Sequence, residues 1–344
     1  MTVITIGIDL AKNVFQIHGV DENGKCQLKK RLKRSQMTTF FANMKPCLIG
    51  MEACAGAHHW ARILIAQGHS VKLMPPQFVK PYVKTNKNDM ADAEAICEAV
   101  SRPNMRFVSI KTSEQQSLLS VHRARTGFVK ARTAQINQIR GLLAEFGIVL
   151  PQGAVAINRH VPELLEDADN GLPMSFRHLL SSLYKNIKQL SEHIETLEAA
   201  INEQFRQDEL CKKIAAIPGV GVLTATAIVS TVGDGKGFKN GRQLAAWLGL
   251  VPLQHSSGGK NVLGRISKRG DVYIRTLLIH GARSVIVARK HKLLPGCWLS
   301  RLLTRRNKNV AAVALANKNA RMLWVLLTTD KEFSPDQTIG AVYM

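Results

Sequence analysis

The sequence predicts an α/β domain at the amino-terminal end, a long helical middle and a mainly α carboxyl-terminal domain. Strand-length apolar runs alternate with short helical patterns over residues 1–105, and two much longer helical patterns follow in residues 106–208. Residues 209–330 return to short apolar helices with many Lys and Arg between them, and residues 331–344 form a tail. A chain of 344 residues accommodates this division, because domains usually contain about 100 to 200 residues.

Three strands are expected first. The runs VITIGIDLA, VFQIHGV and CQLKKRL have strand composition, and Asn23-Gly24 suits a tight hairpin turn between the second and third. A short helix in SQMTTFFANM comes next, with Ser35 as its N-cap.

Two further strands are separated by a helix. CLIGME predicts the fourth strand, AGAHHWARILIAQG predicts a helix that ends at Gly68, and HSVKLM predicts a fifth strand closed by Pro75-Pro76. With a last helix over the following acidic stretch, the order is β-β-β-α-β-α-β-α. This is the order of an RNase H-like domain, in which a hairpin-built sheet is extended by helix-connected strands.

The middle segment predicts two long helices, residues 112–147 and 175–206, joined by a connector that contains Pro and Gly. In the second helix, apolar residues recur at steps of three and four, as in a helical hairpin or coiled coil. They are Leu179, Leu183, Ile187, Leu190, Ile194, Leu197, Ile201 and Phe205.

The first long helix also has a basic face, with Arg123, Arg125, Lys130, Arg132 and Arg140. Such a face is often only solvated surface. The charge of the whole chain favours contact with nucleic-acid phosphates instead.

The third segment begins with the pattern of a helix-hairpin-helix, IAAIPGVGVLTATAIVSTVGD. Backbone N–H groups near Gly219 and Gly221, at the start of the second helix, can hold a DNA phosphate without reading its sequence. A tight helix corner is the alternative. Residues 260–325 contain fifteen Lys or Arg and one acidic residue, Asp271, so we expect this domain to face nucleic acid.

The charge of the chain limits its partners. With 47 Lys and Arg, 25 Asp and Glu and a net charge of +22, the protein is expected to bind a polyanion, and nucleic acid is favoured over an anionic membrane surface. No apolar run approaches the roughly 20 residues of a membrane span, and the start of the chain does not resemble a signal peptide. We therefore expect a cytoplasmic, nucleoid-associated protein without a membrane partner. The six Cys form no CxxC pair, which argues against a zinc site.

Four acidic residues have the placement of a metal site. Asp9 lies in the first strand and Glu52 at the end of the fourth, and these strands are neighbours in an RNase H-like sheet. Asp89 and Asp92 are three residues apart on a helix and point the same way. Converging carboxylates repel one another unless cations lie between them, and Mg²⁺ prefers such ligands together with phosphate oxygens. Alternatively, Asp89 caps its helix and Asp92 pairs with Lys87.

A serine-containing loop lies in the third segment. Ser256 and Ser257 precede two glycines, which allow close backbone approach to a ligand. Nearby cations can assist deprotonation of a serine hydroxyl and stabilise charge on phosphorus. A flexible surface turn is the alternative. The basic residues around the loop are Lys260, Arg265, Lys268 and Arg269.

Several motifs occur in order along nearly the whole chain: GIDLAK, MEACAGAHHW, KNDMADA, IPGVGVLTA, AAWLGLVP, and a Ser-Gly followed by GRISKRGD. In this combination the chain resembles the DEDD-type insertion-sequence transposases, relatives of the Piv pilin-gene invertases. The resemblance implies a RuvC-like amino-terminal domain, a coiled-coil linker, and a carboxyl-terminal transposase domain with a serine nucleophile.

The resemblance also implies roles for particular residues. The four carboxylates named above match the Mg²⁺-binding tetrad, and Ser257 matches the nucleophile that forms a transient phosphoserine link to DNA. Ser257 is preferred to Ser256 because the family's serine directly precedes a glycine, here Gly258. The family further implies a homo-oligomer, a dimer or tetramer, in which the tetrad of one protomer faces the serine of another. It implies a structured non-coding guide RNA that pairs with donor and target double-stranded DNA.

We therefore interpret the chain as a transposase, a site-specific DNA recombinase that uses Mg²⁺ and a serine-DNA intermediate. One alternative is a RuvC-like nuclease that cleaves branched DNA by water attack and leaves no covalent adduct. The other is a nucleic-acid-binding protein without catalysis, in which the acids are ion-pair partners.

Overall fold

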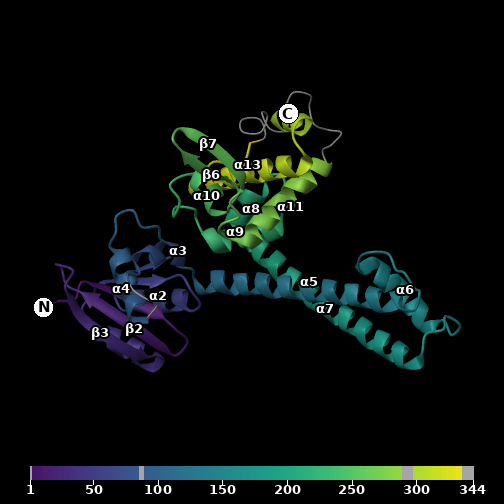
Figure 1. Ribbon diagram of the computed structural model, residues 1–344, viewed down its shortest axis with the longest axis horizontal. Coiled ribbons are helices and arrows are strands. Elements are labelled where there is room, and N and C mark those ends of the chain that lie inside the picture. Colours follow the sequence, from purple (N-terminus) through teal and green to yellow (C-terminus); the bar gives the residue numbers. More distant parts are fainter. Residues whose placement is uncertain (1, 85–88, 289–296, 335–344) are drawn as a thin grey trace. The chain divides into compact units, whose positions relative to one another are not determined.

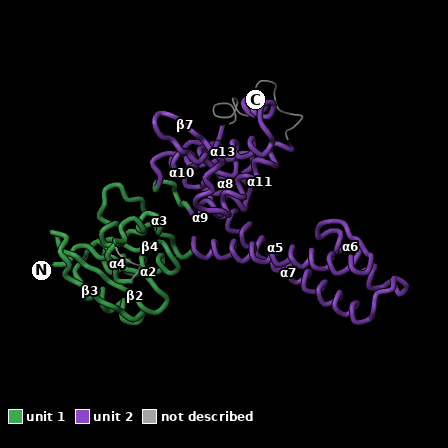
Figure 2. Tube along the Cα trace, in the orientation of Figure 1, with its two compact units in different colours: residues 1–114, 232–237 green, residues 115–231, 238–344 purple. Residues whose placement is uncertain are grey.

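The computed structural model describes residues 2–84, 89–288 and 297–334 and is shown as a ribbon in Figure 1. The chain divides into two compact units, which Figure 2 colours separately. Unit 1 contains residues 1–114 and 232–237, and unit 2 contains residues 115–231 and 238–344.

Unit 1 is built around one sheet. Its elements are β1 (Thr5–Leu10), β2 (Val14–Val20), β3 (Cys26–Lys33), η1 (Arg34–Gln36), α1 (Met37–Ala42), β4 (Leu48–Glu52), α2 (Ala57–Ala66), β5 (Ser70–Met74), α3 (Pro76–Val79), η2 (Lys80–Tyr82) and α4 (Asp89–Val100). The strand order is β3-β2-β1-β4-β5, with β1 antiparallel to β2 and parallel to β4. This confirms the predicted mixed α/β sheet, and the topology is consistent with an RNase H-like domain.

The two faces of the sheet are covered differently. Ile6, Ile8 and Met51 are fully buried on one face, in a core cluster that includes residues of α1 and α2. Gly7 and Gly50 point to the other face, because side chains alternate along a strand, and residues of α4 lie against them. The sheet is therefore a middle layer between helices.

The predicted N-cap at Ser35 is wrong. Ser35 lies inside the 3-10 turn η1, and α1 begins at Met37 with Gln36 at its cap position. The side-chain Oε1 of Gln36 accepts a hydrogen bond of 2.8 Å from the backbone N–H of Lys33. This bond holds the turn that precedes α1, so the helix starts later than the Ser pattern suggests.

Unit 2 is mainly helical. Its elements are α5 (Ser113–Ala144, which begins at the boundary of the units), α6 (Ala154–Glu166), α7 (Met174–Gln207), α8 (Glu209–Ala215), α9 (Val222–Val232), α10 (Gly241–Trp247), β6 (Pro252–Ser257), β7 (Lys260–Ile266), α11 (Val272–Ala288), α12 (Trp298–Arg305) and α13 (Lys308–Thr328). This agrees with the predicted helical remainder of the chain.

The long helices α5 and α7 pair antiparallel, as Figure 1 shows. Arg125 forms an ion pair with Glu198, the ring of Phe128 stacks on His193, and Arg132 donates to Ser191. Partners farther along α5 thus lie earlier in α7. On α7, Ile187, Ile194 and Ile201 of the predicted stripe are buried at seven-residue intervals, whereas Leu179 is exposed.

The connector between these helices contains a helix that the sequence pattern did not predict. Pro162 lies inside α6, where it has no N–H to donate to the carbonyl of Asn158. The hydroxyl of Tyr184 on α7 donates to that carbonyl at 3.4 Å instead. Ile157 and Val161 then pack into the same core cluster as residues of α5 and α7, which stabilises α6.

The predicted Gly-rich loop near Ser257 is the turn of a β-hairpin. β6 pairs antiparallel with β7, and both serines are on β6. Gly258 and Gly259 form the turn with φ of 57° and 78°. Two consecutive positive φ values are the geometry of a two-residue hairpin turn, which disfavours residues with a Cβ. The serines are therefore in an ordered strand pair.

Among the described residues, α13 is the one helix long and apolar enough to cross a membrane by length and composition, and 56% of its apolar window is buried within the protein. Leu315, Leu323 and Leu327 on this helix belong to the buried core. This burial is typical of the core helix of a folded domain.

Candidate acidic metal centre and serine hairpin

Asp9 is the penultimate residue of β1, and Glu52 is the last residue of the neighbouring strand β4. The parallel pairing of β1 with β4 runs from Thr5 opposite Leu48 to Ile8 opposite Met51, and the two acids are the next residue on each strand. Both therefore lie at the carboxyl edge of the parallel strands, where open α/β sheets commonly bind ligands. The sequence prediction that these strands are neighbours is correct.

Close packing of α4 brings the remaining two acids to this edge. A Cβ on Gly7 would lie 2.2 Å from the backbone oxygen of Ala93 and 2.3 Å from the backbone nitrogen of Cys97. A Cβ on Gly50 would lie 2.7 Å from the Cβ of Val100. Without side chains at these two positions, the helix axis approaches the sheet and its first turn lies over the end of β1.

The first turn of α4 contains Asp89 and Asp92. One carboxylate oxygen from each of Asp9, Asp89 and Asp92 can be chosen so that all three lie within 4.8 Å of one another. This convergence fits a divalent cation, because three hard oxygen donors at such spacing can ligate one ion. Lys87, the suggested partner of Asp92, lies outside the described residues, and Lys84 pairs with Glu98 at 2.7 Å.

Glu52 is not one of these three residues, but its carboxyl lies close enough to Asp9 and Asp92 to be affected by their charges. Burial raises the pKa of its carboxyl above the usual value, and the negative charges of Asp9 and Asp92 raise it further. Such mutual repulsion is the condition that a bound cation relieves. The donor set and its charge thus suit a divalent metal held by Asp9, Asp89 and Asp92, with Glu52 beside it.

The two serines of the hairpin differ in their surroundings. The Ser256 hydroxyl donates to Oδ1 of Asn261 at 3.0 Å and accepts from the side-chain amide of Gln254 at 2.9 Å. Ser257 is the last residue of β6 and pairs in register with Lys260 across the turn. Side chains of consecutive strand residues point to opposite faces, so the Ser257 hydroxyl lies on the other face of the hairpin from this network.

The base of the hairpin is held by a buried arginine that sequence reasoning missed. Arg275 on α11 is 6% exposed, and its Nη1 donates to the carbonyls of Leu248 at 2.9 Å and Arg269 at 2.8 Å. A Cβ on Gly270 would lie 1.8 Å from the oxygen of Trp247, so the chain segments on either side of the hairpin touch. The sequence signal that could have indicated this buried residue is a single Arg inside the apolar run VYIRTLLI.

The predicted nucleic-acid contacts fall into two groups. Lys260, Arg265, Lys268 and Arg269 are all exposed on or directly after the hairpin, as are Arg123 and Lys130 on α5. By contrast, Arg125 is paired with Glu198, and Arg132 donates to the hydroxyl of Ser191. These last two side chains join α5 to α7.

The two glycines of the predicted helix-hairpin-helix also differ. Gly219 has a φ of 87°, and a Cβ there would lie 2.8 Å from the backbone oxygen of Gly281, so its small size permits contact with α11. Gly221 is exposed with open space around it, at the start of α9. Of the two, Gly221 has the more open surroundings.

Fold and site together define a class: an RNase H-like domain with an acidic edge, joined to a basic helical unit, as expected of an enzyme that acts on nucleic acid. Comparison with known proteins agrees. Residues 6–148 match the family described as DEDD_Tnp_IS110, transposase, and residues 211–294 match the transposase IS116/IS110/IS902 family.

Relatives cover almost the whole chain. A probable family 20 transposase of Pseudomonas aeruginosa is 49% identical over 97% of this chain and 100% of the relative. The transposase for insertion sequence element IS1111A of Coxiella burnetii is 46% identical over 95% of this chain and 90% of its own. The transposase for IS1328 of Yersinia enterocolitica is 44% identical over 96% and 99%. The chain belongs to the IS110 family of DEDD transposases, and it is a DNA transposase of an insertion sequence.

Proposed function

We propose that this transposase cuts and rejoins DNA through a serine-DNA intermediate in a Mg²⁺-dependent reaction. The observation that carries the metal part is the convergence of Asp9, Asp89 and Asp92 within 4.8 Å at the edge of the sheet. Glu52 completes the tetrad that the family resemblance implies. The serine part rests on Ser257, which lies beside a turn of two glycines and among exposed cations.

The acids and the serine have separate tasks in this mechanism. Asp9, Asp89 and Asp92 would hold the divalent ion, with Glu52 beside it. When bound, the ion supplies positive charge that stabilises the attacking and leaving oxygens of an in-line displacement at phosphorus. Among the residues of the hairpin, Lys260 is placed opposite Ser257 and offsets negative charge at the reacting phosphate.

The bond changes balance without an external energy source. Oγ of Ser257 attacks the scissile phosphorus and loses its proton, while the phosphorus–oxygen bond to one strand end breaks and that end takes up a proton. The hydroxyl end of another strand then attacks the same phosphorus and releases Ser257 with its proton restored. One phosphodiester is broken and one is formed, so strand exchange needs no ATP.

The hydroxyl of Ser257 needs a partner to become a good nucleophile. The acidic residues belong to unit 1 and the serine to unit 2. The family resemblance implies a composite site in a dimer or tetramer, in which the acids of one protomer act with the serine of another. The antiparallel α5–α7 pair is proposed as the coiled-coil linker of that assembly.

Binding of donor and target DNA is assigned to the exposed basic residues. We expect Lys260, Arg265, Lys268 and Arg269 to contact phosphates near the serine, and Arg123 and Lys130 to contact them along α5. Gly221 offers a backbone phosphate contact of the helix-hairpin-helix type. The net charge of +22 is also compatible with a structured guide RNA, and a nucleoid-associated location would follow from DNA binding.

The proposal is tested by trapping the intermediate. The purified protein is incubated with DNA containing its element ends, the proposed guide RNA and Mg²⁺, quenched with denaturant, and assayed for covalently attached DNA. We expect an adduct in the wild type and in Ser256→Ala, and none in Ser257→Ala or Asp9→Asn. Retained binding of DNA by Ser257→Ala shows that the variant is folded.

Two results would overturn the serine assignment. An adduct lost in Ser256→Ala and kept in Ser257→Ala would move the nucleophile to the neighbouring residue. Metal-dependent cleavage by Ser257→Ala, with no adduct in any variant, would indicate water attack by a nuclease-like centre.

A further inference from the structure

Unit 2 contains a cavity whose lining includes none of the four acids and no residue of the β6–β7 hairpin. It has a volume of about 430 Å³, within the range of about 300 to 1,000 Å³ typical of small-molecule sites. α10, α13 and the segment directly after α13 form it. Its lining includes Arg242, Lys318, Arg321, Met322, Lys331 and Phe333.

Positive charge surrounds the cavity. Arg242, Lys318, Arg321 and Lys331 line it, with Glu332 as the single acidic lining residue. No ion pair with a carboxylate joins any of these four cations among residues 2–84, 89–288 and 297–334. Burial and the nearby Arg321 lower the pKa of Lys318, as expected for cations held together without an anion.

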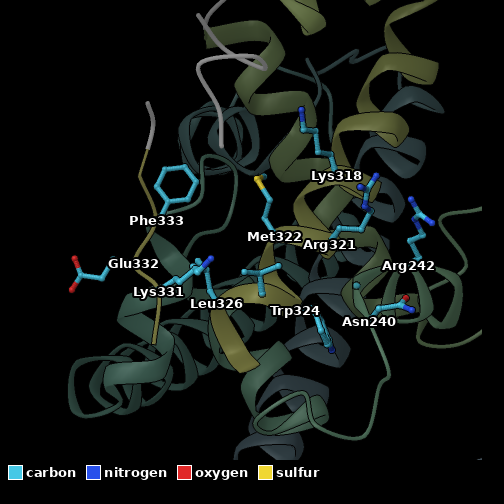
Figure 3. Close-up of a pocket in the computed structure, with 12 residues that line it drawn as sticks. Asn240, Arg242, Lys318, Arg321, Met322, Trp324, Leu326, Lys331, Glu332 and Phe333 are labelled. Atoms are coloured by element: carbon cyan, nitrogen blue, oxygen red, sulfur yellow. The ribbon is translucent and has the colours of Figure 1, made fainter. Parts of the chain in front are cut away.

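The interior of the cavity is apolar. Met322 and Leu326 are buried on α13, Phe333 is half-buried, and Val325 is exposed. Figure 3 shows Phe333 on one side of the cavity and the guanidinium groups of Arg321 and Arg242 on the other, with Met322 between them. A ligand with a flat apolar part beside an anionic group would match this division.

The wall near the cations is rigidly built. A Cβ on Gly241 would lie 2.8 Å from the backbone oxygen of Arg321, so α10 is in contact with α13 at the point where these cations project. The indole Nε1 of Trp324 donates to the carbonyl of Phe238 at 3.1 Å, which fixes this lining ring. The cavity is therefore formed by packed elements.

We propose that this cavity binds a single unpaired nucleotide of the nucleic acid on which the transposase acts. The cations would hold the phosphate, and the base would lie against Phe333 and Met322. A nucleotide combines the flat apolar group and the anion that the lining requires, and stacking of bases on aromatic side chains tolerates any sequence. The site is independent of the proposed serine chemistry and needs only that the protein binds DNA or RNA.

The test compares two DNA duplexes of equal length on the full chain. One is fully paired, and the other has one bulged 2-aminopurine, whose fluorescence falls when the base stacks on a protein ring. We expect the wild type to quench the bulged base and to bind the bulged duplex more tightly. Arg321→Gln and Val325→Trp should each weaken the bulged complex about tenfold and leave the paired complex nearly unchanged. Val325→Trp fills the cavity without changing its charge.

Arg306→Gln is the matched control, because it removes another exposed cation of unit 2 that does not line the cavity. It should behave as the wild type with the bulged duplex. Equal losses on both duplexes in Arg321→Gln, or an unquenched base in the wild type, would overturn the proposal. So would a loss of self-association in Val325→Trp with unchanged binding of the bulged duplex, since the occupant would then be a second copy of the chain.

Discussion

The close contact between α4 and the sheet at Gly7 predicts the effect of Gly7→Ala on stability and on metal binding. In Gly7→Ala, the new Cβ would lie 2.2 Å from the backbone oxygen of Ala93. The new Cβ would meet backbone atoms of α4, the oxygen of Ala93 and the nitrogen of Cys97, so no flexible side chain can move aside. The clash is relieved only if α4 moves away from β1. Asp92 directly precedes the contacted residue Ala93, so it would move with the helix.

The size of the displacement follows from the contact. A Cβ in ordinary van der Waals contact lies 3.4–4 Å from its neighbour, so α4 must move by about 1 Å. Overpacking of this kind costs typically about 1 to 3 kcal/mol of unfolding free energy. Ligand distances in metal sites hold within about 0.2 Å, so a 1 Å movement of Asp92 relative to Asp9 should weaken metal binding strongly.

Two measurements check this reasoning. Urea unfolding followed by near-ultraviolet absorption in a background where the three Trp of unit 2 are replaced by Phe, which leaves Trp60 of unit 1 as the reporter, gives the free energy. Repetition over a Mg²⁺ series gives the stabilisation by metal. We expect Gly7→Ala to lose about 2 kcal/mol and most of the Mg²⁺-induced shift. Gly127→Ala is the control, because this helical glycine has no atoms within 4 Å and alanine there should be neutral or stabilising. An unchanged Mg²⁺ shift in Gly7→Ala would refute the account.

Three further predictions concern charge. Glu52→Gln should raise the metal-free stability of unit 1 by up to about 1 kcal/mol and lower its stabilisation by Mg²⁺, measured in the same titrations, because it removes a carboxyl whose pKa is raised by burial and by Asp9. His122 is buried, its pKa is lowered to about 4 mainly by that burial, and it contacts Tyr273 and Thr226. The unfolded chain therefore takes up a proton near pH 6.5 that the folded chain does not. Stability should be full above that pH and fall by up to about 3 kcal/mol as the pH drops to about 4, whereas His122→Gln should lack this dependence in urea titrations. Arg275→Met leaves two carbonyls without their donor and should cost about 2 to 4 kcal/mol; proteolysis at the β6–β7 hairpin should become faster, and an unchanged cleavage rate would exclude its role at the hairpin base.

Much of the fold could be predicted because its signals are local. The strands of unit 1 alternate or stay apolar over their own length. The turn between β2 and β3 also depends on residues close along the chain, because the Asp21 carboxylate accepts from the backbone N–H groups of Asn23 and Lys25, and Gly24 has a positive φ. α6 could not be predicted in the same way. The carbonyl that Pro162 leaves without a donor receives one from Tyr184, which is on another helix.

In the candidate site, too, the local features could be predicted and the contacts between distant segments could not. The sequence contains acids in the first and fourth strands and in a following helix, and it shows a serine before two glycines within a basic segment. By themselves these patterns indicated a metal site and a basic loop. The prediction of a DEDD-type transposase came from the resemblance of the ordered motifs to that family.

Only the tertiary structure decided which of these residues meet. The approach of Asp89 and Asp92 to Asp9 depends on contacts of α4 with Gly7 and Gly50, and neither glycine is near the helix in sequence. The pairing of Arg125 with Glu198 likewise removes one predicted cation from the free surface of α5. The physical reason is that packing and ion pairing depend on distances in space, whereas periodicity and turn chemistry act between residues that are close along the chain.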